Sequence, residues 1–203
     1  MDSLRKNEIR SKAKEINDLS EQFQLIHATY ATQEFIKKIV KEFYQEKLDS
    51  LGARIAEKLK VDANISEELE EKENLENLIK RNRAIINIGY ININDENVAR
   101  VVKVDNAFTI YLASSLRDSI FTEKNEYNYK TIQKIRELMS HELGHLALHT
   151  KELLLEDSTQ GSLNIKDDEK EIEANFFGKE LLNLRKERNK KIRYDGGAEN
   201  LFW

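Results

Sequence analysis

The 203-residue chain contains no cysteine and no proline. The lack of cysteine excludes disulfide bonds and thiolate metal ligands, and it is typical of a cytoplasmic protein. No apolar run approaches the roughly 20 residues that a membrane span needs, and the first eight residues lack the apolar segment of a signal peptide. An excess of basic residues is also missing, since the formal net charge is −4. We therefore expect a cytoplasmic protein that binds neither nucleic acid directly nor membranes.

The most informative feature that is present is a cluster of histidines. Three of the four histidines fall within nine residues, in the segment S-H-E-L-G-H-L-A-L-H that starts at Ser140. Apolar residues recur every three or four positions over residues 131–148, which predicts one amphipathic helix. On such a helix His141 and His145 lie one turn apart on the same face, where two imidazoles can share one Zn²⁺. Glu142 is then placed to act as a general base without being a ligand itself.

A catalytic zinc needs a third protein ligand and one open position. His149 is the nearest candidate, but three imidazoles along one helix do not easily converge tetrahedrally on one ion. A second helix, predicted over residues 167–182, is the better source, because its small residues Ala174 and Gly178 allow two helices to approach closely. Glu171 on that helix can complete a His-His-Glu site.

The other polar residues of the second helix have simpler expected roles. Glu173 points about 200° away from Glu171 around the helix, so at most one of the two can be a ligand. We expect Glu173 and Glu180 to lie on a solvated face. Asn175 lies one turn after Glu171, where it can hydrogen-bond a liganding histidine and fix its tautomer.

The two motifs together resemble those of the ImmA/IrrE metallopeptidases of bacteria and their mobile elements. The resemblance covers residues 84–182 and rests on H-E-L-G-H-L-A-L-H followed by E-x-E-A-N-x-F-x-x-x-L-L. It implies that His141, His145 and Glu171 are zinc ligands and that Glu142 is the catalytic base. In two places the chain departs from the family, which usually has alanine where Gly178 stands and Met-Pro where Asn183-Leu184 stands. Neither departure removes a ligand.

The resemblance also implies a function. We expect a zinc-dependent endopeptidase that cleaves a protein regulator, with a helix-turn-helix repressor or an antitoxin as its substrate. The alternative is a zinc-binding regulatory module of the same fold that does not cleave. Peptidases of this kind usually have a second group that stabilises the oxyanion, and the sequence does not choose among the candidates Tyr111, Tyr127, Tyr129, His149 and Tyr194. We expect His149 to cap the metal helix or to hydrogen-bond near the site.

The order of the predicted elements gives an α+β fold. Helical patterns cover residues 4–19, 21–48, 53–60 and 66–82, and His27 reads as a packing residue of the second pattern. Alternating patterns then predict strands over residues 85–93, 98–104 and 107–113, with a bulge at Gly89 and a hairpin turn at Asp105-Asn106. The prediction is a mainly helical protein with a small, mostly antiparallel three-stranded sheet packed beside the HEXXH helix.

We expect three regions along the chain. Residues 1–83 form a helical N-terminal region, residues 84–193 form the zinc metallopeptidase core, and residues 194–203 form a flexible tail. In the resembling peptidases an edge strand pairs with the extended substrate, and the strand at residues 108–112 is the candidate for that role. An interior position in the sheet is an equally good expectation for it.

Overall fold

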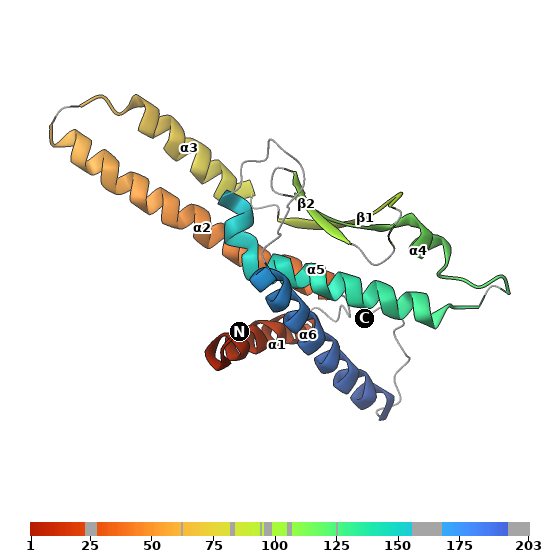
Figure 1. The fold of residues 1–203 in the computed structure, drawn as a ribbon. Helices are drawn as coiled ribbons and strands as arrows, with labels where there is room; N and C mark the ends of the chain where they lie inside the picture. Colours follow the sequence, from red (N-terminus) through yellow and green to blue (C-terminus); the bar gives the residue numbers. More distant parts are fainter. Residues whose placement is uncertain are drawn as a thin grey trace.

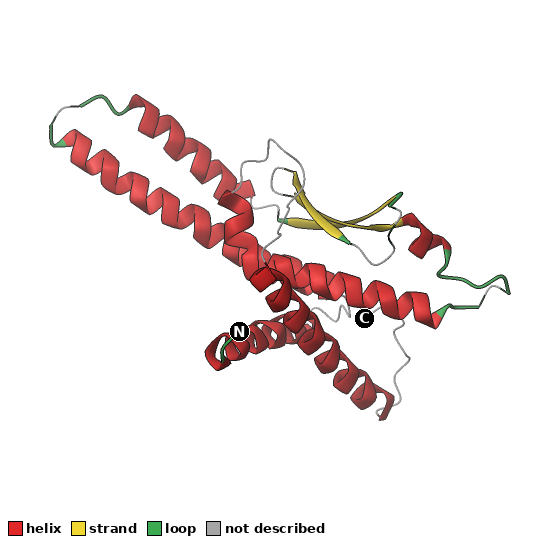
Figure 2. Ribbon diagram, in the orientation of Figure 1, coloured by secondary structure: helices red, strands yellow, loops and turns green. Residues whose placement is uncertain are grey.

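The structure, a computed structural model of the chain, describes residues 1–22, 28–61, 63–81, 84–93, 95, 99–104, 107–124, 126–155 and 168–194. Figures 1 and 2 show helices at both ends of the sequence and a small sheet between them. In chain order the elements are α1 (Ser3–Gln22), α2 (Ala28–Leu59), α3 (Ser66–Arg81), β1 (Ile85–Ile91), β2 (Arg100–Val104), β3 (Ala107–Ala113), α4 (Ser114–Asp118), α5 (Tyr129–Leu155) and α6 (Asp168–Tyr194). The predicted α+β class, mainly helical with three strands, is confirmed.

The helix boundaries differ from the expected ones where packing overrides local sequence. The patterns at residues 21–48 and 53–60 belong to one continuous helix, α2, which passes through Gly52 without a break. Leu51 beside this glycine is buried, so tertiary contacts support the helix at this point. The metal-motif helix α5 extends beyond the predicted end to Leu155, and His149 therefore lies inside the helix and not at its end.

The sheet is mixed, in the order β1-β3-β2. β2 and β3 pair antiparallel, as expected, but β3 also pairs with β1, and this second pairing is parallel. The strand that we considered for an edge role, β3, is thus the interior strand. The predicted bulge at Gly89 is wrong, because β1 keeps its register with β3 from Ile85 to Ile91. A Cβ atom at Gly89 would lie 2.7 Å from Cε1 of Tyr111, so the glycine makes room for the tyrosine ring on the next strand.

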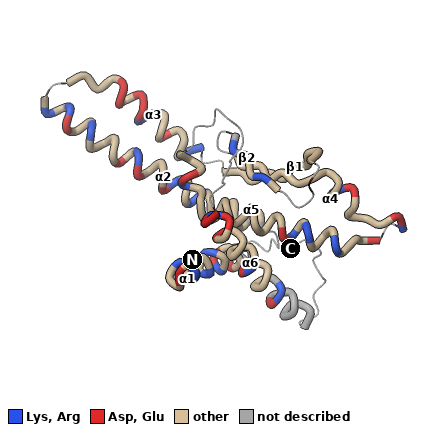
Figure 3. Tube along the Cα trace, viewed as in Figure 1, with Lys and Arg blue, Asp and Glu red and all other residues tan. Residues whose placement is uncertain are grey.

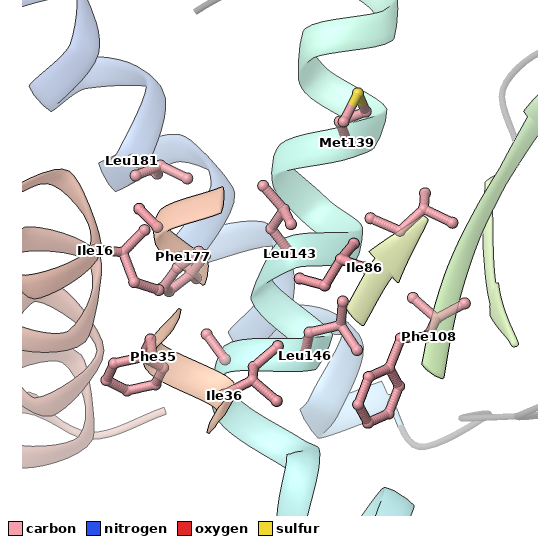
Figure 4. Packing of buried hydrophobic residues seen from close by; sticks show 14 of the residues in the cluster. Ile16, Phe35, Ile36, Ile86, Phe108, Met139, Leu143, Leu146, Phe177 and Leu181 are labelled. Carbon is pink, nitrogen blue, oxygen red and sulfur yellow. The ribbon is translucent and has the colours of Figure 1, made fainter. Parts of the chain in front are cut away.

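Helix α5 lies at the centre of the hydrophobic core. Its apolar residues pack towards the sheet on one side and towards α2 and α6 on the other, and α1 packs in turn on α2 and α6 (Figure 4). One cluster of buried side chains includes Ile16 and Ile36 from the N-terminal helices, Phe108 from the sheet and Leu143 and Phe177 from the motif helices. The helices that precede residue 84 thus share their core with the helices that carry the motifs.

Helices α2 and α3 form a hairpin whose far end projects from the body of the molecule (Figure 1). Among the described residues, no helix is both long and apolar enough to span a membrane. Some predictions concern residues outside the described ranges. These are the packing role of His27, the turn at Asp105-Asn106 and the tail after Tyr194.

Candidate metal centre

The candidate site forms where α5 and α6 cross, and small residues allow the two helices to touch. A Cβ atom on Gly144 would lie 2.9 Å from the backbone oxygen of Ala174, a distance that real Cβ contacts essentially never show. A Cβ atom on Gly178 would lie 3.1 Å from the backbone nitrogen of His141. The backbones therefore pack directly against each other at two points, and this proximity brings side chains of the two helices within reach of one ion.

The three predicted ligands come together at this crossing. The Nε2 atoms of His141 and His145 lie 3.0 Å apart, and the planes of their rings are inclined by 88°. Glu171, in the first turn of α6, places Oε2 3.2 Å from Nε2 of His141 and Oε1 3.4 Å from Nε2 of His145. Two imidazoles and one carboxylate thus point at a common position.

These separations fit the geometry of a tetrahedral metal site. With metal–ligand bonds of about 2.0 to 2.1 Å and tetrahedral angles, two ligand atoms are expected about 3.3 Å apart. The separation of the two Nε2 atoms is 3.0 Å, and each histidine lies 3.2 or 3.4 Å from a different carboxylate oxygen of Glu171, so all three distances are close to that value. The buried Nδ1 atoms of both histidines have no hydrogen-bond partner within the described residues, so hydrogen bonds at Nδ1 do not set the ring orientations. The group of His141, His145 and Glu171 can therefore hold a metal ion.

The electrostatics of His145 favour the neutral imidazole that a metal requires. Burial, and then the neighbouring His141 and His149, lowers the pKa of His145 from its usual value to about 3. At neutral pH the ring therefore carries a lone pair on one nitrogen and can act as a ligand without first releasing a proton.

Glu142, the predicted base, is buried between α5 and the edge strand β2 with 5% of its surface exposed. Burial, and then the charge of Glu171, raises the pKa of Glu142 to about 8, while a hydrogen bond from the backbone N–H of Val101 acts in the opposite direction. The carboxyl group is thus protonated at neutral pH in the metal-free chain. A cation bound beside it would favour the ionised form, because opposite charges attract strongly in a poorly solvated site.

The expectation of a solvated face is wrong for Glu173, whose side chain is only 16% exposed, whereas Glu180 makes an exposed ion pair. Arg5 on α1 donates two hydrogen bonds to the carboxylate of Glu173, of 2.6 Å from Nε and 2.5 Å from Nη2. Two turns further along α6, Arg10 contacts Glu180 at 3.3 Å. The sequence pattern of α6 alone could not reveal this, because the partner of Glu173 lies 168 positions away in the chain. Two arginines of α1 therefore form ion pairs with α6, the helix that carries Glu171.

His149 is a buried neighbour of Glu173. It is 3% exposed, its Nε2 atom is 3.9 Å from Oε2 of Glu173, and burial lowers its pKa. This Nε2 atom has no hydrogen-bond partner within the described residues. The capping role that we expected for His149 is wrong, because α5 continues to Leu155, and the ring lies instead between His145, at 5.8 Å between ring centroids, and Glu173 on α6.

The remaining residues that the sequence suggested for the site are not assigned a role in it by the structure. Asn175 is exposed, and the buried Nδ1 atoms of both histidines lack the hydrogen bond that we expected it to provide. Tyr127 and Tyr129 are exposed, and Tyr111 lies on β3 across from Gly89. The side chain of Tyr194 lies outside the described set. No second group for an oxyanion is thus assigned.

An open cleft of about 580 Å³ adjoins His141. It is lined by the N-terminal half of α5, from Gln133 to His141, and by the middle of α6, from Asn175 to Lys186. Ser140 and Gly178, where the helices touch, lie at its inner end, and residues further along each helix form its walls. A ligand that occupies this cleft therefore reaches the candidate metal position from one side.

No family model, curated protein or solved structure matches the chain. The resemblance to the ImmA/IrrE metallopeptidases therefore rests on the two motifs, and the arguments that follow rest on the geometry of the site.

Proposed function

We propose that the protein is a zinc-dependent endopeptidase of the ImmA/IrrE type that cleaves a protein regulator, such as a helix-turn-helix repressor or an antitoxin. The observation that carries the proposal is the convergence of His141, His145 and Glu171 on one position, with the buried carboxyl group of Glu142 beside them. Two imidazoles and one carboxylate are a ligand set of catalytic zinc sites that keep one position open.

Each residue has a definite task in this proposal. His141, His145 and Glu171 hold the ion, and the bound ion supplies Lewis-acid chemistry to a peptide carbonyl and to water. Glu142 accepts the proton of the attacking water at its carboxylate and returns a proton to the leaving amine. Burial and the charge of Glu171 raise the pKa of Glu142 to about 8 in the metal-free chain, and a bound cation would favour the ionised form that can accept the proton.

The substitution Glu142→Gln tests this proposal, because it removes the base while keeping the shape of the side chain. We expect the variant to bind zinc and to fold like the wild type but to cleave no protein. Glu70→Gln, on the remote face of α3, is the matched control, since it removes an exposed carboxylate far from the site. The measurement is mass spectrometry of new N-termini in a proteome extract incubated with each zinc-loaded protein.

One observation favours the alternative, a zinc-binding regulatory module that does not cleave. Glu142 is only 5% exposed and accepts a hydrogen bond from Val101, so β2 partly covers the group that would have to reach the water. Fragments that appear with the wild type and with Glu70→Gln, but not with Glu142→Gln or in the presence of a chelator, support the peptidase. If the wild type binds zinc and no fragment depends on Glu142, the binding module is the correct function.

A further inference from the structure

The cleft beside His141 has a polar and partly basic lining, although the chain as a whole is acidic. The α5 wall contributes Gln133 and Glu137, and the α6 wall contributes amide groups and two lysines. Figure 3 shows basic positions on both helices in this region. The lining residues that matter for the argument are Gln133, Glu137, Asn175, Lys179, Asn183 and Lys186.

The two lysines of the cleft have no partner in the described part of the chain. Other lysines near the helix crossing are paired, since Lys151 contacts Glu46 and Lys170 contacts Glu152. Within the described residues, Lys179 and Lys186 make neither a hydrogen bond nor an ion pair. The acid opposite them, Glu137, accepts a hydrogen bond of 2.7 Å from Nε2 of Gln133, on its own helix. Glu137 keeps its negative charge, but the two lysines outnumber this one carboxylate, so the charged side chains that line the cleft leave a net positive charge for a ligand.

The dimensions of the cleft suit an extended peptide. Lys179 and Lys186 lie two turns apart on one face of α6, about 10 Å along the helix axis. An extended peptide covers that length with about three residues. From Asn175 to Lys186 the wall measures about 16 Å, enough for about five extended residues. The amide groups of Asn175 and Asn183 can bond the backbone of such a peptide, because each offers both a donor and an acceptor.

We propose that this cleft binds an extended, acidic segment of the protein substrate on one side of the bond to be cut, and that Lys179 and Lys186 select acidic side chains. The proposal rests on the proposed function, because it treats the cleft as a continuation of the site at His141. It names the class of substrate, an unfolded or loop segment with acidic residues two or four positions apart, because alternate side chains of an extended peptide face the same wall.

Binding of peptide probes tests this specificity without requiring cleavage. The probes are three fluorescein-labelled peptides of equal length in which serine alternates with aspartate, asparagine or lysine. The zinc-loaded Glu142→Gln protein is titrated against each probe by fluorescence anisotropy. We expect the aspartate probe to bind at least about tenfold more tightly than the asparagine probe, and the lysine probe to bind most weakly.

Charge reversal assigns the effect to the two lysines. The double substitution Lys179→Glu and Lys186→Glu is expected to weaken binding of the aspartate probe about tenfold or more and to favour the lysine probe. The matched control is Lys41→Glu, an exposed lysine of α2 outside the cleft, which is expected to leave the order of the three probes unchanged. Circular dichroism checks that each variant is folded, which is expected because all three side chains are exposed.

Two results would overturn the proposal: equal affinity for the three probes, or an equal effect of Lys41→Glu and of the double substitution. The proposed function fails independently. If the aspartate probe binds selectively through Lys179 and Lys186 but the wild type produces no fragment that depends on Glu142, the cleft is a recognition site of a protein that does not cleave. If Glu142-dependent fragments form with no acidic residues near the cut, the peptidase stands and the specificity is refuted.

Discussion

Replacing Arg5 with alanine should destabilise the protein far more than the same change at Arg10. The Arg5 side chain makes two hydrogen bonds to Glu173, whose side chain is only 16% exposed. Without Arg5 this carboxylate stays mostly buried, with His149 at 3.9 Å as its nearest basic group within the described residues. Breaking a fully buried pair costs about 3–5 kcal/mol, so we expect about 2–3 kcal/mol for this partly buried one.

Arg10 provides the matched control on the same helix. It contacts Glu180 at 3.3 Å, its side chain is 53% exposed, and it also lies over the ring of Phe176. An exposed pair of this kind contributes about 0–1 kcal/mol, and a cation–π contact at an exposed site adds about 0.5 kcal/mol or a little more. The difference of about 1.5 kcal/mol between the two variants corresponds to a difference in Tm of about 3–6 °C for a chain of this size.

The assay is urea unfolding followed by circular dichroism, with a chelator present so that metal binding does not contribute to stability. A double variant, Arg5→Ala with Glu173→Gln, should regain most of the lost stability, because it no longer buries an unpaired carboxylate. The reasoning would be refuted by equal losses at Arg5 and Arg10, or by a double variant less stable than Arg5→Ala alone.

Three further predictions concern the site itself. Gly144→Ala should weaken zinc binding and cost about 1–3 kcal/mol in an unfolding experiment, because its Cβ would lie 2.9 Å from the backbone oxygen of Ala174; unchanged stability would show that the helices can separate freely. Glu171→Ala should lower zinc affinity in a competition titration with a chelating dye far more than Glu173→Ala, and equal effects would refute the choice of ligand. In the metal-free protein, the pKa of Glu142 is about 8 in the folded state, against an ordinary value of 4.5. Between these two pH values the folded state binds a proton that the unfolded state has released. This residue therefore makes the unfolding free energy fall as pH rises from about 4.5 to about 8. Glu142→Gln should flatten that part of the pH profile of the unfolding free energy, and an unchanged slope would contradict the buried, protonated carboxyl group.

Much of the fold and the ligand set was predictable because the signals are local. The spacing of His141 and His145 places both rings on one face of a helix whatever surrounds it, and the apolar period of α5 requires no knowledge of its neighbours. The small residues Ala174 and Gly178 correctly indicated a close helix crossing. Gly144 belongs to the same contact, because its backbone packs against Ala174. A glycine inside the histidine motif of a helix was a signal of this close approach that could have been used.

The features that could not be predicted depend on contacts between distant segments. Nothing near Glu173 in the sequence indicates Arg5, and the burial of Glu142 depends on the position of Val101 in an edge strand. The parallel pairing of β1 with β3 depends on which edge β2 occupies, which the strand patterns do not encode. Likewise, the continuous α2 is explained by burial around Leu51 and not by local preference.

The most direct test of the proposed metal centre is anomalous scattering at the zinc absorption edge, from crystals of the chain grown with one equivalent of zinc. The account predicts one strong peak per chain, about 2.0 to 2.1 Å from the Nε2 atoms of His141 and His145 and within bonding distance of a carboxylate oxygen of Glu171. A zinc peak elsewhere on the chain, with none between these three side chains, would contradict it.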